Sequence, residues 1–333
     1  MGPTLPVAFA DAEEAGAGSS LRRLTSGVPL PLCTVFAALL LLTTACSSVS
    51  SAGDVTMSVD DSSTVPTTVA SPTTPAVGDS STTSTSTTTT TLAAPAAIEP
   101  LMGNYTVTVV DELAHDPYAF TQGLEWHDGW LYESTGQYEQ SDLRRIDPTT
   151  GEVDALVPLA DHLFGEGLTI VGGEILQLSW REGELLRSGI DDLAPITTQR
   201  YEGDGWGLCH DGDHLIMSSG TNLLTKRDPV TFEVVSTLAV TTNGRPLEML
   251  NELECVGDQI LANVYGLDQI VVIDAMSGIV VAVVDASALR PDGLSADNAD
   301  YVLNGIAFQP DTGRWYLTGK YWPVMYEVEI VAS

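Results

Sequence analysis

The sequence predicts an all-β fold, a five-bladed β-propeller, for the part of the chain that follows residue 101. Short runs of apolar and β-branched residues are separated by Asp-Gly, Gly-Asp and Thr-Gly turns, and no helical period extends beyond two turns. A repeat starts at five positions, which lie 44, 40, 45 and 53 residues apart: Gly123, Gly167, Gly207, Glu252 and Gly305. A period of about 40–50 residues with four strands per unit is typical of propeller blades.

The repeats share one design, which accounts for each blade in turn. Each repeat has an apolar opening, a short turn and a strand of alternating pattern; in order they are GLEWHDGWLYEST, GLTIVGGEILQLSW, GLCHDGDHLIMSSG, ELECVGDQILANVY and GIAFQPDTGRWYLTGK. Three continue to an Asp-centred turn: RRIDPTTGEV, TKRDPVTFEV and VVIDAMSGIV. YTVTVV (105–110) is expected to pair with MYEVEI (325–330), so that strands from both chain ends close the last blade and remove exposed edges. A lipocalin-like barrel is the weaker alternative, because it gives no reason for the repeat.

The N-terminal segment predicts export. Arg22 and Arg23 precede an apolar run at about residues 28–42, which is too short to span a membrane and is typical of a signal peptide. The run ends in LTTAC (42–46), which resembles a bacterial lipobox except that Thr43 stands where Leu is usual. We therefore expect residues 1–46 to be a signal peptide and Cys46 to be lipidated, with ordinary secretion as the alternative. The protein is expected to be a cell-surface lipoprotein or a secreted protein.

Composition indicates where the folded domain begins and which partners are excluded. Residues 47–101 are rich in Ser, Thr and Pro and are expected to form a disordered tether, which leaves residues 102–333 as the folded catalytic domain. The chain has 13 Lys and Arg against 45 Asp and Glu, a net charge of -32. This charge argues against nucleic-acid binding and against adhesion to anionic lipid, so any membrane contact is expected only through the lipid anchor. We expect a monomer.

Two cysteines lie in the predicted domain, Cys209 and Cys255. Outside the cell they could form a disulfide, but two separately buried thiols fit the sequence equally well. No CxxC motif or His/Cys cluster indicates structural zinc. His210 and His214 flank a predicted turn in CHDGDH and are expected to be solvated.

The repeat register predicts a site at one rim of the ring. Loops that enter the innermost strands converge there, and they contain Phe120–Gln122, Phe164–Glu166, Gly205–Trp206, Leu250–Asn251 and Leu303–Asn304. A second set follows the second strands: Trp180, Tyr265 and Lys320. Polar groups among aromatic side chains are typical of a small-molecule site. Glu166 lies between two glycines in FGEGL, which we interpret as a turn, and Lys320 is one of only two lysines.

Longer motifs resemble a known family. HDPYAFTQGL, LYESTGQY, LRRIDPTTGEV, FGEGLT, YEGDGWGL, LNELE, LNGIA and TGKYWPVMYEV are similar, in order and spacing, to the glutamine cyclotransferase family, the plant and bacterial type of glutaminyl cyclase. The resemblance extends from about residue 104 to 330. It implies a five-bladed propeller that converts N-terminal Gln of peptides or proteins to pyroglutamate with release of ammonia. It also implies no catalytic metal and no cofactor; a structural calcium ion is not decided by these residues.

The resemblance implies the site residues by position. The catalytic set falls on Glu166, Asn251 and Lys320, and the substrate-binding set on Phe120, Gln122, Phe164, Trp180, Trp206 and Tyr265. Tyr265 stands where the family has a tryptophan, and this change adds a hydroxyl and shrinks the pocket, so it bears on substrate preference. Ser219 is a lesser departure, in a turn that normally contains Asp.

The expected enzyme is an aminoacyltransferase that uses no metal. Its expected mechanism uses Glu166 as a proton shuttle, which accepts a proton from the attacking amine and donates it to the leaving nitrogen. Asn251, Gln122 and Lys320 are candidates to hold the amide and stabilise the oxyanion. A non-catalytic surface propeller that binds peptides or glycans is the alternative, since propellers have many functions. A hydrolase ranks last because no Ser has a plausible His–Asp pair.

Overall fold

The computed structural model describes residues 99–333 apart from Ala296 and Ala299. The predicted signal peptide, the predicted lipidation site Cys46 and nearly all of the predicted tether lie outside the described residues. In the described part the strands are, in chain order, β1 (Gly103–Ala114), β2 (Thr121–His127), β3 (Trp130–Thr135), β4 (Asp142–Ile146), β5 (Val153–Pro158), β6 (Gly165–Val171), β7 (Glu174–Ser179), β8 (Glu184–Gly189), β9 (Pro195–Arg200), β10 (Leu208–His210), β11 (Leu215–Met217), β12 (Leu223–Arg227), β13 (Val234–Ala239), β14 (Thr241–Thr242), β15 (Arg245–Pro246), β16 (Leu250–Val256), β17 (Gln259–Val264), β18 (Gln269–Asp274), β19 (Val280–Asp285), β20 (Leu303–Gln309), β21 (Arg314–Gly319) and β22 (Val324–Ala332).

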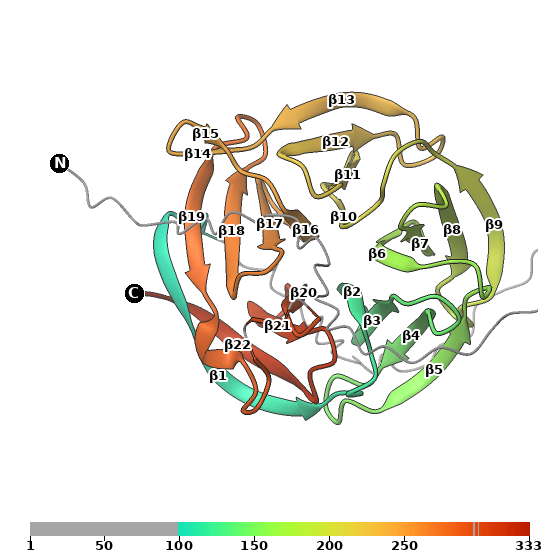
Figure 1. The fold of residues 1–333 in the computed structure, drawn as a ribbon, viewed down its shortest axis with the longest axis horizontal. Helices are drawn as coiled ribbons and strands as arrows, with labels where there is room; N and C mark the ends of the chain where they lie inside the picture. The colour runs from blue at the N-terminus through green and yellow to red at the C-terminus, as the bar shows by residue number, and fades with distance from the viewer. Residues whose placement is uncertain (1–98, 296, 299) are drawn as a thin grey trace, which may run out of the picture. The chain divides into compact units, whose positions relative to one another are not determined.

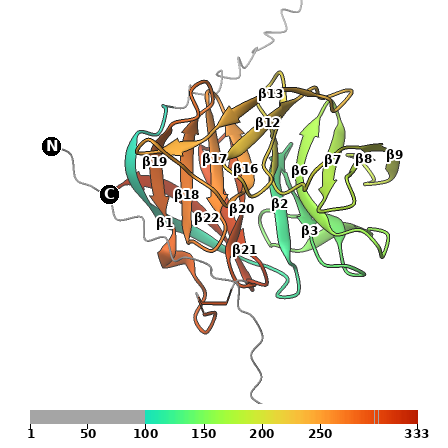
Figure 2. The ribbon, with the colours of Figure 1, turned by 45° about the horizontal axis from the view of Figure 1, so that its top comes forward.

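The strands form sheets that surround a central axis (Figure 1). Three sheets have four strands each, β2–β5, β6–β9 and β10–β13, and the strands of each pair antiparallel in sequence order. An eight-stranded sheet has the order β16-β17-β18-β19-β1-β22-β21-β20. The first strand of each group, β2, β6, β10, β16 or β20, lies nearest the axis, and the sheets stand side by side when the ring is tilted (Figures 1 and 2).

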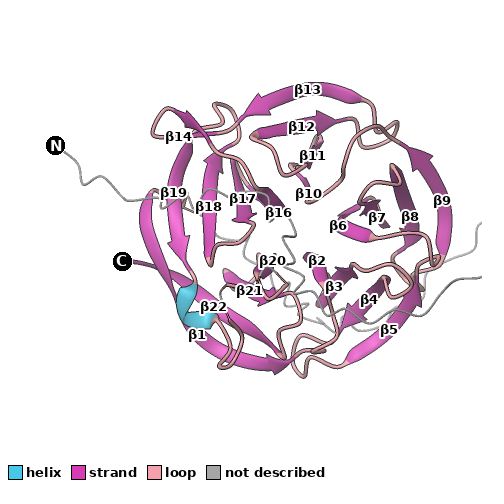
Figure 3. Ribbon diagram, in the orientation of Figure 1, coloured by secondary structure: helices cyan, strands magenta, loops and turns pink. Residues whose placement is uncertain are grey.

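The all-β class is confirmed, because strands and loops make up nearly all of the described chain (Figure 3). The only helix among the described residues is a short 3₁₀-helix, η1 (Ser287–Leu289). No helix in residues 99–333, leaving aside Ala296 and Ala299, is long and apolar enough to cross a membrane. The strand-and-turn pattern, with Gly at many turns, therefore predicted the right secondary structure.

The hydrophobic core lies between neighbouring sheets. One cluster, for example, packs Leu176 and Leu185 of β7 and β8 against Leu208 and Leu215 of β10 and β11, and all four are buried. Another joins β17–β19 to β20–β22 and contains Trp315 and Trp322 among its buried residues. Because alternate residues of a strand face opposite sides, each sheet presents apolar side chains to both of its neighbours.

Strands from the two ends of the folded part pair with each other. β1 lies antiparallel to β22, with Tyr105 opposite Ala332 and Ala114 opposite Val324, so the predicted pairing of 105–110 with 325–330 is confirmed. The start of β1 also pairs in parallel with β19 over four residues, from Gly103 opposite Ala282 onward. The ends of the sheets that would otherwise be exposed are thus hydrogen-bonded.

Cys209 and Cys255 form a disulfide, with their Cα atoms 5.5 Å apart. The bond joins β10 to β16, which are the innermost strands of two neighbouring sheets. The structure therefore decides between the two alternatives that the sequence left open. His210 is the last residue of β10 and His214 immediately precedes β11, so they flank a turn as predicted, but both are partly buried rather than solvated.

Candidate active site

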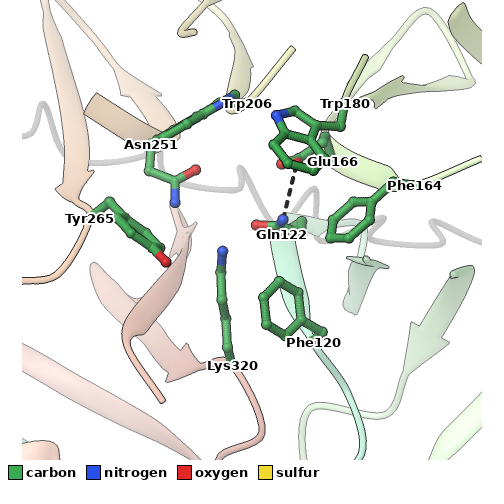
Figure 4. A pocket seen from close by; sticks show the side chains of 9 residues that line it. All are labelled: Phe120, Gln122, Phe164, Glu166, Trp180, Trp206, Asn251, Tyr265 and Lys320. Atoms are coloured by element: carbon green, nitrogen blue, oxygen red, sulfur yellow. Dashed lines mark hydrogen bonds between the residues drawn. The ribbon is translucent and has the colours of Figure 1, made fainter. Parts of the chain in front are cut away.

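All nine residues predicted for the site line one pocket with a volume of about 250 Å³. They are Phe120, Gln122, Phe164, Glu166, Trp180, Trp206, Asn251, Tyr265 and Lys320. Their side chains come from different sheets and point toward one space, with Lys320 extending between Phe120 and Tyr265 (Figure 4). The structure thus brings the whole set together, while the role of each residue stays a prediction.

Three polar residues reach the pocket from equivalent places in the innermost strands. Gln122, Glu166 and Asn251 are each the second residue of their strand, β2, β6 and β16. The strand pairing slips at each of these places, between Thr121 and Gly123, Gly165 and Leu168, and Leu250 and Leu253. Such β-bulges turn a side chain away from the regular pleat. The bulges therefore explain why a buried strand presents these polar groups to a cavity.

The aromatic wall comes from the segments next to these strands. Phe120 and Phe164 immediately precede β2 and β6, and their rings meet edge to face at 5.9 Å between centroids. Trp180 and Tyr265 immediately follow β7 and β17. Their recurrence after corresponding strands matches the register read from the sequence, and the wall gives the pocket a mainly apolar surface that restricts water.

The glycines on either side of Glu166 are required by close packing of the backbone. Both lie inside β6, so the interpretation of FGEGL as a turn is wrong. A Cβ atom on Gly165 would lie 2.4 Å from the carbonyl oxygen of Thr135, and one on Gly167 would lie 2.6 Å from the amide nitrogen of Leu208. The Gly167 amide also donates to the carbonyl of Trp206 at 2.6 Å. The glycines let neighbouring strands approach each other around Glu166.

Glu166 is a buried carboxylate, with 4% of its surface exposed. Gln122 donates from Nε2 to Glu166 Oε1 at 3.0 Å (Figure 4). Burial raises the pKa of Glu166 well above its ordinary value; Lys320 opposes this rise, and Glu182 and Asp204 add to it. A carboxyl with a raised pKa can both accept and donate a proton near neutral pH.

Lys320 is also buried, with 3% of its surface exposed, and is therefore not a surface charge. Its Nζ lies 4.5 Å from the ring centre of Phe120 and 5.2 Å from that of Tyr265. Burial lowers the pKa of Lys320 to about 8, while Glu166 and Asp300 oppose the change. The site therefore holds one acid and one base whose pKa values have both moved toward neutrality.

Several buried polar atoms in the pocket have no hydrogen-bond partner within the described part of the protein. They are Glu166 Oε2, Trp206 Nε1 and Asn251 Oδ1. Unpaired buried polar groups cost free energy unless a ligand or water satisfies them. Two acceptors and one donor are therefore free to bind a polar ligand inside an aromatic pocket.

Sequence reasoning missed a second layer of side chains around the mouth. Tyr138 packs against Phe164 with ring centres 5.4 Å apart, and Tyr321 packs against Phe120 at 5.1 Å. The guanidinium of Arg181 lies 3.7 Å from the ring centre of Trp180. Arg181 and Tyr321 directly follow predicted site residues in the chain, and this adjacency was the available signal.

A buried ionic network lies behind the pocket and was also missed. Glu133 is fully buried and forms hydrogen bonds with His115 Nε2 at 2.9 Å and with the Thr121 hydroxyl at 2.7 Å. The other ring nitrogen of His115 lies 2.6 Å from the carbonyl oxygen of Trp322. Burial lowers the pKa of His115, but the charge of Glu133 and its hydrogen bond outweigh burial, so the pKa is raised. The network ties the segment before Gln122 to the segment after Lys320.

Among the described residues, no group of three or more His, Cys, Asp and Glu side chains has an arrangement that could hold a metal ion. The two carboxylates that add to the raised pKa of Glu166, Glu182 and Asp204, have other contacts. Glu182 accepts a hydrogen bond from Tyr138 at 2.9 Å, and Asp204 lies 3.7 Å from Arg181.

Comparisons with known proteins agree with the motifs. The model of the glutamine cyclotransferase family matches residues 81–330. The chain is 37% identical over 227 residues to a glutaminyl-peptide cyclotransferase of Arabidopsis thaliana, which covers 67% of this chain and 71% of the relative. It is also similar to the crystal structure of the glutaminyl cyclase of Myxococcus xanthus, with a TM-score of 0.66 and 36% identity over 70% of this chain and all of that one. The resemblance read from the motifs is confirmed, and the chain belongs to the glutamine cyclotransferase family.

Proposed function

We infer that the protein is a glutaminyl-peptide cyclotransferase, which converts the N-terminal Gln of peptides or proteins to pyroglutamate and releases ammonia. The observation that carries this inference is that a buried carboxylate, Glu166, and a buried lysine, Lys320, line the same small aromatic pocket in a chain from this family. A pocket of about 250 Å³ suits one side chain with its α-amine rather than a long peptide segment.

The reaction needs little more than positioning and proton transfer. The neutral α-amine attacks the side-chain carbonyl carbon, and a C–N bond forms to close a five-membered ring. The amine gives one proton to the Glu166 carboxylate. Glu166 then gives that proton to the amide nitrogen as its C–N bond breaks, so that NH₃ leaves and the carbonyl re-forms. Both reacting groups belong to one molecule, so folding the side chain back supplies much of the rate.

Glu166 suits the role of shuttle because its environment brings its pKa toward neutral pH. Its Oε2 atom has no partner within the described residues and belongs to a side chain that lines the pocket. General acid–base catalysis of this kind contributes about 10²–10⁴-fold. The carboxylate returns to its starting state at the end of the reaction, so the cycle consumes no other proton donor.

Asn251, Lys320 and Trp206 are the candidates to hold the carboxamide. Asn251 Oδ1 can accept a hydrogen bond from the NH₂ group of the substrate carboxamide, and Trp206 Nε1 can donate one to the carboxamide oxygen. Neither Asn251 Oδ1 nor Trp206 Nε1 has a partner within the described protein. The ammonium of Lys320 can stabilise negative charge that develops on that oxygen. Gln122 is the partner of Glu166 here, so its expected role in holding the amide gives way to a role in orienting the shuttle.

We also propose that the ring is a five-bladed β-propeller. Three observations support this proposal: the three four-stranded sheets, the further groups β16–β19 and β20–β22 with β1, and the five apolar clusters between neighbouring sheets.

Lipidation of Cys46, export and a monomeric state remain proposals that rest on the sequence. The mass of the exported protein tests the first: a lipid adduct lost on Cys46→Ala supports it, and an unmodified N-terminus rejects it.

The test of function is direct. The chain is incubated with a peptide that begins with Gln, and with the same peptide acetylated at its N-terminus as a control. We expect equal amounts of ammonia and of lactam from the free peptide and neither product from the acetylated one. Binding of the free peptide without ammonia would instead support the alternative of a non-catalytic peptide-binding propeller.

A further inference from the structure

Asn304 occupies the same place in β20 that Gln122, Glu166 and Asn251 occupy in their strands. It is the second residue of the strand, is fully buried, and lies where the pairing of β20 with β21 slips, between Leu303 and Ile306. Its side chain does not line the pocket. Instead its Nδ2 donates to the carbonyl oxygen of Thr121 at 2.9 Å and to Gln122 Oε1 at 3.3 Å.

These contacts form a chain of hydrogen bonds in which each amide has only one possible orientation. A backbone carbonyl can only accept, so the Asn304 amide must present its NH₂ group to Thr121. The same NH₂ group reaches the Gln122 side chain, which must therefore present its oxygen to Asn304. The Gln122 NH₂ group is then left for Glu166 Oε1, at 3.0 Å. Thr121 is fixed in turn, because its hydroxyl donates to the buried Glu133 at 2.7 Å.

We propose that Asn304 is a positioning residue that locks the Gln122 amide and thereby gives the two oxygens of Glu166 different tasks. Oε1 is held as an acceptor, and Oε2, which has no partner within the described residues, carries the proton. This inference rests on the proposed function, because it concerns the proton that Glu166 transfers.

The fixed orientation of the Gln122 amide matters in the half of the reaction in which Glu166 is protonated. A free carboxamide could rotate by half a turn and accept the carboxylic acid proton on its own oxygen. The proton would then be held between Glu166 and Gln122 and withheld from the leaving nitrogen. With Asn304 in place, Oε1 already accepts from Gln122, so the proton taken from the amine stays on Oε2. It passes from there to the amide nitrogen as the C–N bond breaks, and NH₃ leaves.

Other groups that act on Glu166 are not changed by a substitution at residue 304. The charged groups that affect the carboxylate are Lys320, Glu182 and Asp204. The phenols of Tyr138, Tyr201 and Tyr265 also lie within electrostatic reach. A change in the protonation of Glu166 after substitution of Asn304 would therefore be transmitted through Gln122.

The test compares the pH dependence of kcat for the full chain and for Asn304→Leu, which keeps the branched shape but removes the donor. At saturating substrate the acid limb reports the enzyme–substrate complex. In the variant, rotation of Gln122 stabilises protonated Glu166, so we expect the limb to move up by about 0.5–1 pH unit. We expect kcat at its optimum to fall by about 2–10-fold, which is the effect of one such hydrogen bond.

The control is Asn263→Leu. Asn263 is also fully buried and accepts from the Gly305 amide at 3.0 Å, so it supports the same strand without touching Gln122. We expect the acid limb of Asn263→Leu to stay in place. We also expect Asn304→Leu to cause no further movement in a Gln122→Met background, because the coupled pair is already broken.

The inference is wrong if Asn304→Leu leaves the acid limb in place, if Asn263→Leu moves it equally, or if the movement persists in the Gln122→Met background. Should Asn304→Leu not fold, Asn304→Ala is read in the same way. A wild-type chain that releases no ammonia from a Gln peptide would contradict the proposed function. An active wild type with an unmoved limb in the variant would contradict this inference alone.

Discussion

Glu166 and Lys320 are buried charges of opposite sign in one aromatic pocket, and each limits the pKa shift of the other. Burial raises the pKa of Glu166 and lowers that of Lys320 to about 8. Each charge attracts the other, so each group keeps part of its ionised form despite desolvation. This balance lets a carboxylate accept a proton while a nearby ammonium still stabilises negative charge.

Removal of the lysine charge should therefore change both rate and pH dependence. We expect Lys320→Met to lower kcat by about 10²-fold, as for the loss of one electrostatic contact to an oxyanion. Because Lys320 loses its proton near pH 8, wild-type activity should fall above that pH, and the variant should lack this alkaline decline. Its acid limb should move to higher pH, since the charge that lowers the pKa of Glu166 is gone.

The matched control is Trp180→Phe, which keeps an aromatic wall and all charges. We expect a smaller loss, below about tenfold, since trimming part of one hydrophobic contact costs about 1 kcal/mol, which is roughly fivefold in rate. Steady-state kinetics over a range of pH with a Gln peptide checks both variants. An alkaline decline that survives in Lys320→Met would remove Lys320 from the mechanism.

The sequence predicted individual residues well where a repeat or a motif marked them. Glu166 and Asn251 stand at corresponding places at the start of innermost strands, Lys320 follows a second strand as Tyr265 does, and the structure brings them to one pocket. It could not predict the partner of Gln122, because the bond from Asn304 joins residues 182 positions apart. It could not predict the buried pair of His115 and Glu133 either, since nothing in the local sequence distinguishes a buried His from a solvated one.

At the scale of the strand, the β-bulge is the device that makes the site. A regular innermost strand would direct alternate side chains into the two neighbouring packing layers. The slip in each strand adds one residue and directs Gln122, Glu166 or Asn251 to the cavity instead. A glycine follows Gln122 and Glu166, and it leaves room for the innermost strand of the adjacent sheet. A Cβ on Gly123 would lie 2.6 Å from the Leu168 amide nitrogen, and one on Gly167 would lie 2.6 Å from that of Leu208.

Gly167→Ala tests this role of backbone packing. A Cβ there would lie 2.6 Å from both the Leu208 amide nitrogen and the Trp206 carbonyl oxygen. We expect a loss of about 3 kcal/mol in the free energy of unfolding, typical of severe overpacking. Activity should fall as well, since the displaced segment contains Glu166 and contacts the Trp206 backbone. Urea unfolding measures the change.

Gly172→Ala is the control, because that glycine has a positive φ of 60° but no atom within 4 Å of an added Cβ. It should cost only about 1 kcal/mol for the left-handed conformation and leave turnover unchanged. If the two variants lost equal stability, close packing around Glu166 would not be the reason for the glycines.

The elements themselves were largely predictable, and the misses have physical causes. The five repeat openings correspond to β2, β6, β10, β16 and β20. FGEGL suggested a turn because glycine favours turns, whereas here contact between strands far apart in the sequence requires it. Whether Cys209 and Cys255 pair depends on the distance between β10 and β16, which tertiary structure alone determines.

For the folded part as a whole, stability depends on β1. This strand pairs along β22, and its Leu113 belongs to the cluster that packs against β20–β22. Tyr105 and Val107 contact the neighbouring cluster. Without β1, the last sheet would present a long unpaired edge, and an exposed edge favours aggregation.

Two shortened chains test this dependence. A chain that begins at residue 99 retains every described strand, so we expect its unfolding temperature to lie within about 2 °C of the full-length protein, a shift worth less than 1 kcal/mol. A chain that begins at residue 115 lacks β1 and should aggregate or unfold without cooperativity. Calorimetry and light scattering distinguish the outcomes, and a soluble, cooperatively folded protein without β1 would contradict this dependence.

Proton transfer by Glu166 is the central claim, and ammonia release by Glu166→Gln tests it most directly. Glutamine keeps the size of the side chain but cannot carry the proton, so we expect release from a Gln peptide to fall by about 10²–10⁴-fold. The unfolding temperature should not fall, because a buried carboxylate is removed. Glu182→Gln should keep turnover within about threefold, since glutamine can still accept from Tyr138 and burial, not Glu182, is the main cause of the raised pKa of Glu166. Near-normal ammonia release by Glu166→Gln would contradict the mechanism.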